Sequence, residues 1–155
     1  MSQAETEKRY RIGFVCVENA GRSQIATAVA KTQIQIRNRS DINIISGGTD
    51  PATEIYPNVV QVMREKGYDL STQVPRKISS EEIRECDIVA LMGCSLSIDA
   101  LPAGIIVRDW RCIDPADADI ESVMAISTEI ERQVIELLDE LPDETYKQTQ
   151  LSSVQ

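Results

Sequence analysis

The sequence predicts an α/β fold of three layers, αβα, in which helices cover a four-stranded parallel sheet. Short apolar segments typical of strands alternate along the chain with longer segments whose apolar residues recur at helical spacing. This alternation is typical of parallel strands joined by helical crossovers. The segment 87–92 (DIVALM) is almost continuously apolar, which indicates a strand covered on both faces. We expect the strand order 2-1-3-4.

The first strand–helix unit begins at Tyr10. An apolar strand reaches Val17, the loop 18–21 follows it, and a helix starts at Arg22 and ends in the polar stretch 37–40. The pattern places a tight loop between the end of a strand and the start of a helix.

The second unit has the same plan. A strand is predicted over 41–46 and is closed by the glycines 47–48. A helix is predicted from residue 53 or 54 to Lys66, because apolar residues recur there at helical spacing and Gly67 is a good stop.

The second half of the chain continues the alternation with shorter elements. The predicted elements are a short helix at 81–84 capped by Ser79 or Ser80, the strand 87–92, a fourth strand at 104–107 continued by 108–110, and a long amphipathic helix at 120–141. No repeat or linker divides the chain. We therefore expect one domain over 1–155, with a core at about 10–141 and flexible tails at 1–8 and 143–155.

Composition excludes several classes of protein. The net charge is −9, from 25 acidic and 16 basic residues, which argues against nucleic acid and membrane surfaces as partners. No apolar run is long enough to span a membrane, and the first residues do not resemble a signal peptide, so we expect a cytoplasmic protein. There is no histidine. We expect no metal and no bound cofactor, and four reduced cysteines rather than disulfides.

The loop after the first strand carries the chemistry. Cys16 ends the strand and Arg22 begins the helix, with five residues between them. Amide groups of such a loop converge where the helix dipole favours negative charge, and arginine grips tetrahedral oxyanions. The residues expected to bind an oxyanion are Val17, Glu18, Asn19, Ala20, Gly21 and Arg22. Cys16 would be the nucleophile, its thiolate favoured by the same field. A buried structural cysteine is the alternative interpretation.

Residues 16–24 (CVENAGRSQ) resemble the phosphate-binding loop of the low-molecular-weight protein tyrosine phosphatase family, most closely its thiol-coupled arsenate reductase branch. Further segments match in order over roughly residues 10 to 140. They are SGGT at 46–49, EKGYDLS at 65–71, MGC at 92–94, DW at 109–110 and DPA at 114–116. The resemblance implies a low-molecular-weight phosphatase-like fold.

The resemblance also implies roles for individual side chains. Asn19 holds the loop through side-chain hydrogen bonds, and Ser23 donates to the Cys16 thiolate. Asp114 is the general acid, although an ordinary Asx turn also explains an Asp-Pro pair. Asp109 is the second choice for the acid. We expect the side chain of Glu18 to point away from the anion.

The reductase branch needs a second thiol. Cys16 and Cys94 follow adjacent strands at the same end of the sheet, about 4.8 Å apart, and disulfides join Cα atoms about 4.4–6.8 Å apart. Residues 92–94 are similar to the resolving-cysteine segment of the reductases, and this resemblance implies that Cys94 is the resolving cysteine; the strand spacing allows the two thiols to meet. Cys86 enters the third strand at the opposite end and is expected to be structural. Cys112 lies two residues from Asp114, as a packed loop residue or a second relay thiol.

Three functions remain open. The first is an arsenate reductase that uses an external thiol reductant: thioredoxin, glutaredoxin or a low-molecular-weight thiol. The second is a phosphatase for phosphotyrosine or other phosphate monoesters. The third is a non-catalytic oxyanion-binding regulatory domain. Aromatic residues make up only 4% of the chain and none follows the Asp-Pro pair, which favours the reductase. The absence of a third cysteine shortly after Cys94 departs from the thioredoxin-linked pattern.

Overall fold

The computed structural model describes residues 10–93 and 101–143. Its elements are β1 (Tyr10–Cys16), α2 (Arg22–Ile36), β2 (Ile42–Gly48), α3 (Pro57–Glu65), α4 (Ser80–Arg84), β3 (Ile88–Leu91), β4 (Ile106–Asp109) and α5 (Ile120–Asp139). The tail expected over 1–8 lies outside the described residues, as does the tail over 143–155 except for Asp143.

The four strands form a parallel sheet in the order β2-β1-β3-β4, which confirms the predicted order. In the register, Cys16 lies opposite Gly48, Val15 opposite Leu91, and Leu91 opposite Asp109. The carboxyl ends of all four strands therefore share one edge. The order reverses beside β1, and ligands of open α/β sheets bind at such a point.

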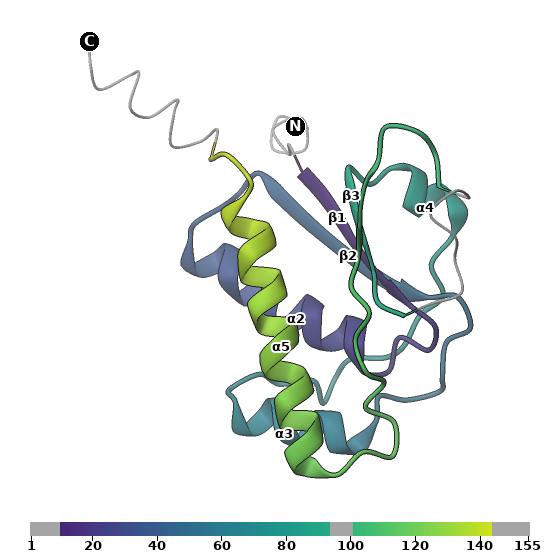
Figure 1. The fold of residues 1–155 in the computed structure, drawn as a ribbon, viewed down its shortest axis with the longest axis vertical. Helices are drawn as coiled ribbons and strands as arrows, with labels where there is room; N and C mark the ends of the chain where they lie inside the picture. The colour runs from purple at the N-terminus through teal and green to yellow at the C-terminus, as the bar shows by residue number, and fades with distance from the viewer. Residues whose placement is uncertain (1–9, 94–100, 144–155) are drawn as a thin grey trace.

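The two faces of the sheet are covered unequally. The helices α2, α3 and α5 lie on one side and the short α4 on the other (Figure 1). The larger apolar cluster includes Phe14, Ile25, Val59 and Ile130 and fills the space under the three long helices. A smaller cluster of Val15, Ile78, Ile83, Cys86, Val89 and Leu91 lies under α4. All four residues of β3 are buried, so this strand is covered on both faces as predicted.

The start of α4 and the end of α3 agree with the sequence signals that predicted them. Ser79 caps α4 in a complete capping box: its side chain accepts from the Glu82 N–H, and Glu82 accepts from the Ser79 N–H. The first of the two candidate serines is thus the cap. Gly67 follows α3 with φ of +99°, a backbone conformation that ends helices and that glycine adopts without strain.

The start of α3 was predicted too early. The helix begins at Pro57 rather than at residue 53 or 54, and Tyr56 before it is extended, with φ −58° and ψ 128°. Proline excludes the helical conformation from the residue before it, because its ring crowds that residue. Tyr56 consequently lies outside the helix, and its backbone N–H bonds to Ala20 in the loop after β1.

The strand ends also differ from prediction. β2 includes Gly47 and Gly48, because they pair with Val15 and Cys16. A side chain at Gly48 would collide with the Val17 carbonyl oxygen, so glycine is required there. β1 ends at Cys16, as the spacing of Cys16 and Arg22 predicts, and β3 covers 88–91. β4 begins at residue 106, since Gly104 has φ of +96°, and α5 ends at Asp139 rather than 141.

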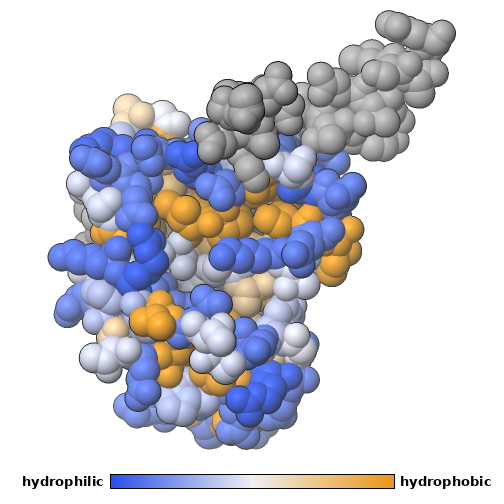
Figure 2. All heavy atoms as spheres, turned by 180° about the vertical axis from the view of Figure 1, so that it is seen from behind, coloured by the Kyte–Doolittle hydropathy of each residue, from blue (hydrophilic) through white to orange (hydrophobic). Residues whose placement is uncertain are grey.

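The surface mixes polar and apolar side chains. On the side turned away in Figure 1, apolar patches are separated by bands of hydrophilic residues (Figure 2). None of the helices within residues 10–93 and 101–143 has the length and apolar character needed to cross a membrane.

Candidate active site

The loop after β1 is tied to the chain that follows β2. Four of its carbonyl oxygens accept backbone hydrogen bonds of 2.8 to 3.0 Å: Cys16 from Thr49, Val17 from Asp50, Glu18 from Ala52, and Ala20 from Tyr56. In a trans peptide the N–H points opposite to the preceding C=O. The carbonyl groups turned outward therefore leave the N–H groups of the loop on its inner side, where that of Asn19 reaches the Cys16 sulfur.

Cys16 lies at the base of this loop and is 2% exposed. Its Sγ accepts a hydrogen bond from the Asn19 N–H (3.1 Å) and lies 2.9 Å from Ser23 Oγ. Ser23 Oγ itself accepts from Asn19 Nδ2 at 2.6 Å, so the hydroxyl proton is available for the sulfur. Both contacts direct a hydrogen-bond donor at the sulfur.

Asn19 has the left-handed backbone conformation that its residue type tolerates, with φ of +54°. Its side chain is fully buried. Its Oδ1 accepts from the Arg76 backbone N–H (2.9 Å) and from Gln24 Nε2 (3.1 Å), and its backbone oxygen accepts from the same Nε2 (3.0 Å). These donors fix which way the amide faces.

Arg22 is 9% exposed at the start of α2. Its guanidinium donates to the Cys112 carbonyl oxygen (3.3 Å) and lies 3.7 Å from Asp114 Oδ2. Gly93 lies directly beside it, with φ of +82°, and a side chain there would collide with Nη1. Gly93 thus lets the backbone pass directly against the arginine.

Asp114 lies beside Arg22, although the two residues are far apart in the sequence. Its Oδ1 accepts from the Ala116 N–H at 3.1 Å, which is the Asx turn, while Oδ2 faces Arg22. Both interpretations of this residue therefore fit the geometry. Asp109 instead accepts from Arg111 Nε at 3.1 Å.

The loop around Asp114 is anchored at two points. Trp110 before it is buried against Phe14, with ring centroids 5.9 Å apart. Asn58 of α3 donates through Nδ2 to the carbonyl oxygens of Pro115 and Ala118, both at 2.9 Å. The carboxyl group is accordingly held by the core and by a helix.

Glu18 is engaged at the rim of the site. Its Oε2 accepts a hydrogen bond of 2.7 Å from the Tyr56 hydroxyl. Burial, this bond and the nearby Asp114 raise the pKa of Tyr56. Glu18 and Tyr56 also line a hollow with Pro57, Asn58, Ala116 and Asp117.

The remaining cysteines differ in position. Cys86 is buried under α4, donates to the Glu82 carbonyl oxygen, and burial raises its pKa to about 11. Cys112 donates to Gln133 Oε1 on α5 at 3.4 Å, and burial raises its pKa to about 11 as well, although Arg22 opposes this. Both environments favour the neutral thiol. Cys94 lies outside the described residues, one position after Gly93.

Four contributors were not assigned a role from the sequence: Gln24, Tyr56, Asn58 and Arg76. Gln24 stands inside the motif at 16–24, so its position was the one available signal. The other three act across 38 to 60 residues of sequence, and no local pattern marks such contacts.

The Cys16 sulfur accepts a hydrogen bond from the Asn19 N–H at the base of the loop, and Arg22, which opens the following helix, lies 3.7 Å from Asp114. In such an arrangement a thiolate can attack a tetrahedral oxyanion, and a carboxylic acid can protonate the departing oxygen. Residues 11–148 match the model of the family described as low molecular weight phosphotyrosine protein phosphatase. The chain belongs to this family.

The relatives within the family carry two kinds of name. A protein of Halobacterium salinarum named "putative arsenate reductase" is 47% identical over 137 residues, which are 86% of this chain and 95% of that protein. A thioredoxin-dependent arsenate reductase of Corynebacterium glutamicum has 31% identity and a TM-score of 0.68, covering 97% of this chain and 68% of that one. A low molecular weight protein tyrosine phosphatase of T. tengcongensis has a TM-score of 0.76 at 18% identity over 86% of this chain and 100% of that one, a likeness of fold.

Proposed function

We propose that this protein is a thiol-coupled arsenate reductase in which Cys16 is the nucleophile and Cys94 the resolving cysteine. The observation that carries the proposal is the cradled Cys16 sulfur, in a chain 47% identical to a relative named for that activity. The bound substrate is a small oxyanion, held by the N–H groups of residues 17–21 and by Arg22.

The first step forms a sulfur–arsenic bond. The Cys16 thiolate attacks arsenate, an arsenic–oxygen bond breaks, and the oxygen leaves as water after protonation. Asp114 is the proposed proton donor, because it lies beside Arg22 at the mouth of the loop. Ser23 stabilises the thiolate before attack. Arsenic is still As(V) at this point.

The second step transfers the electrons. The Cys94 thiolate attacks Cys16 Sγ, a disulfide forms, and the sulfur–arsenic bond breaks with its electron pair passing to arsenic. Arsenite, As(III), leaves, and two thiols have been oxidised to one disulfide. Gly93, the residue before Cys94, lies against Arg22, and this supports the choice of Cys94 as the resolving cysteine. The described residues supply no alternative with an activated thiol, because Cys112 is held by Gln133 with a raised pKa.

An external thiol must reduce the disulfide. A thioredoxin, a glutaredoxin or a low-molecular-weight thiol would serve, and a thioredoxin-dependent reductase is among the structural relatives. The cytoplasm is the proposed location, because its reductants keep such thiols reduced.

A phosphate-monoester phosphatase is the second candidate. The same cradle accepts phosphate, the first step is the same, and water would then hydrolyse the thiophosphate. The family description itself favours this activity. A non-catalytic oxyanion-binding domain is the third, and the convergence of Cys16, Arg22 and Asp114 argues against it.

The deciding experiment measures arsenite formation with thiol reductant, and aryl phosphate hydrolysis, on the same samples. We expect the wild type to form arsenite and a Cys16–Cys94 disulfide, and Cys94→Ser to lose both. Cys16→Ser should lose all turnover while remaining folded. Cys86→Ser is the matched control, because it removes a thiol at the opposite end of the sheet. Ester hydrolysis that ignores Cys94, with no arsenite formed, would make the protein a phosphatase.

A further inference from the structure

We infer that Gln24 and Arg76 are positioning residues that hold Asn19, and through it the Cys16–Ser23 pair, in the arrangement needed for attack. The inference deepens the proposed function and rests on Cys16 being its nucleophile. Neither side chain contacts the sulfur. Both act on Asn19, which contacts the sulfur through its N–H and Ser23 through its side chain.

Asn19 needs support from outside the loop. Its φ of +54° is a conformation that L-residues seldom adopt, and a chain released from its contacts would leave it. A change of φ at this residue would swing the N–H away from Cys16 Sγ. It would also move Nδ2 away from Ser23 Oγ, so one backbone rotation would remove both donors from the sulfur.

Gln24 holds Asn19 from the helix side. It is 4% exposed in the first turn of α2, and its Nε2 donates to both the backbone oxygen and Oδ1 of Asn19. Two acceptors on one residue define the orientation of the peptide and of the side chain together. A side chain of similar size without the amide would fill the same space and leave both oxygens without this donor.

Arg76 holds Asn19 from the sheet side. Its backbone N–H donates to Asn19 Oδ1. The segment around it pairs with the end of β2 in a parallel bridge between Gly48 and Lys77, in which Gly48 N donates to the Arg76 oxygen (2.9 Å) and Ile78 N to the Gly48 oxygen (3.2 Å). The N–H that reaches Asn19 is thus held beside the end of β2.

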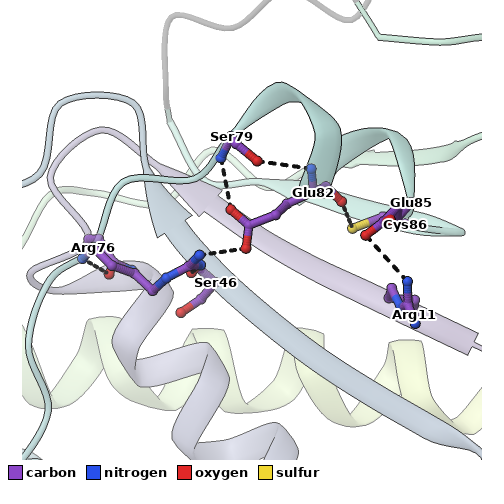
Figure 3. A network of polar contacts seen from close by, with 8 residues as sticks. Arg11, Ser46, Arg76, Ser79, Glu82, Glu85 and Cys86 are labelled. Carbon is purple, nitrogen blue, oxygen red and sulfur yellow. Dashed lines mark hydrogen bonds and ion pairs between the residues drawn. The ribbon is translucent and has the colours of Figure 1, made fainter. Parts of the chain in front are cut away.

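The guanidinium of Arg76 fixes that segment in turn. It donates to the Ser46 carbonyl oxygen (2.6 Å) through Nη1 and pairs with Glu82 Oε2 (2.5 Å) through Nη2. Figure 3 shows Arg76 between Ser46 on β2 and Glu82 on α4, whose carboxylate also accepts from the Ser79 N–H. A chain of contacts therefore runs from the cap of α4 through Arg76 and Asn19 to Cys16.

The role of Arg76 depends on its two-pronged geometry more than on its charge. Its side chain is 47% exposed, so solvent weakens the ion pair itself. Lysine carries the same charge but lacks the planar fork that reaches two acceptors in fixed directions. Arg76→Lys should therefore hold the segment beside Asn19 in part, and Arg76→Gln should hold it little.

The test follows the pH dependence of alkylation at Cys16. Iodoacetamide labelling is read on the tryptic peptide 12–22, in which Cys16 is the one cysteine. We expect Gln24→Met to shift the midpoint of the alkylation profile upward by about 0.5 to 1 pH unit. This is the 3- to 10-fold effect of losing about one hydrogen bond to the sulfur. Arg76→Gln should shift it in the same direction, and Arg76→Lys less. The kcat for arsenate should fall by a similar factor with KM nearly unchanged.

Matched controls separate positioning from general destabilisation. Gln33→Met makes the same replacement farther along α2, where Gln33 contacts Arg37, and Arg132→Gln removes an arginine that pairs with Glu129 and Glu136 on α5. Profiles of Gln24→Met and Arg76→Gln that coincide with these controls would overturn the inference. If Gln24→Met does not fold, the comparison of Arg76→Gln with Arg76→Lys decides alone. A wild type that is alkylated at low pH but forms no arsenite would disprove the proposed function and leave this inference standing.

Discussion

At the scale of single residues, the two oxygens of Asp114 make different contacts. Oδ1 accepts from the Ala116 N–H and shapes the turn, while Oδ2 faces Arg22 across 3.7 Å. The turn needs an acceptor, which an amide also provides. Proton donation needs a carboxylic acid. One substitution can therefore remove the chemistry and keep the structure.

Asp114→Asn should lower kcat for arsenate by about 100-fold or more, the contribution usual for a positioned general acid. Thermal stability should stay close to that of the wild type, because the asparagine oxygen can accept the same backbone bond. Steady-state kinetics and thermal melts of the same preparation provide the measurement.

Asp109→Asn is the control for that change. Asp109 lies at the end of β4 and accepts from Arg111, so its replacement should leave kcat within about 2-fold. A large loss of kcat in Asp109→Asn, with little loss in Asp114→Asn, would show that Asp109 rather than Asp114 is the proton donor.

At the scale of elements, the loop that carries Asp114 is attached to α3. Asn58 lies in the first turn of that helix and donates to two carbonyl oxygens of the loop. The helix therefore sets where the carboxyl group lies, although the two segments are nearly sixty residues apart. The late start of α3 at Pro57 puts Asn58 at this position.

Asn58→Ala should release the loop, because the carbonyl oxygens of Pro115 and Ala118 lose their donor. We expect kcat to fall by about 3- to 10-fold, the usual effect of a lost hydrogen bond. KM should change less, because the amides of residues 17–21 still bind the oxyanion. Gln61→Ala, at an exposed position of the same helix, should behave as the wild type. Equal kinetics in the two variants would show that the tether has no part in turnover.

Prediction from sequence succeeded where the signal was local. The alternation of apolar segments predicted the parallel sheet, the serine–glutamate pattern predicted the cap of α4, and the glycine after α3 predicted its end. Prediction failed where a partner distant in the sequence determines the conformation. Gly47 and Gly48 belong to β2 because β1 pairs with them, and glycines by themselves indicate a turn.

The same distinction applies to the site. The spacing from Cys16 to Arg22 marks the loop, because loop and helix are continuous in sequence. The supports of the loop come from elsewhere: Tyr56 and Arg76 reach it only once β2 lies beside β1. A single sequence carries no local pattern for such contacts.

At the scale of the whole molecule, the two neutral thiols on opposite faces link stability to pH. The pKa of Cys86 under α4 and that of Cys112 against α5 are each raised from 9.0 to about 11 by burial. The unfolded chain would ionise both thiols at lower pH than the folded chain. Their contribution to stability is therefore complete below about pH 9 and is lost as the pH rises to about 11.

The free energy of unfolding should accordingly fall between pH 9 and 11 more steeply in the wild type than in Cys86→Ala/Cys112→Ala. Urea unfolding under reducing conditions at several pH values gives the two curves. Burial also raises the pKa values of Tyr56 and Tyr68, so both proteins should lose some stability at high pH. Parallel curves would show that the thiols are not buried in the way described.

The four carbonyl groups of residues 16, 17, 18 and 20 that bond to residues 49–56 have a consequence for protein engineering. A designer who transplants the nucleophile loop and its helix onto another sheet would move the sulfur and the arginine but leave behind the partners that turn the peptide planes. The smallest portable unit is therefore three segments, 16–24, 48–56 and the stretch around Arg76 whose N–H bonds to Asn19, mounted on two adjacent parallel strands.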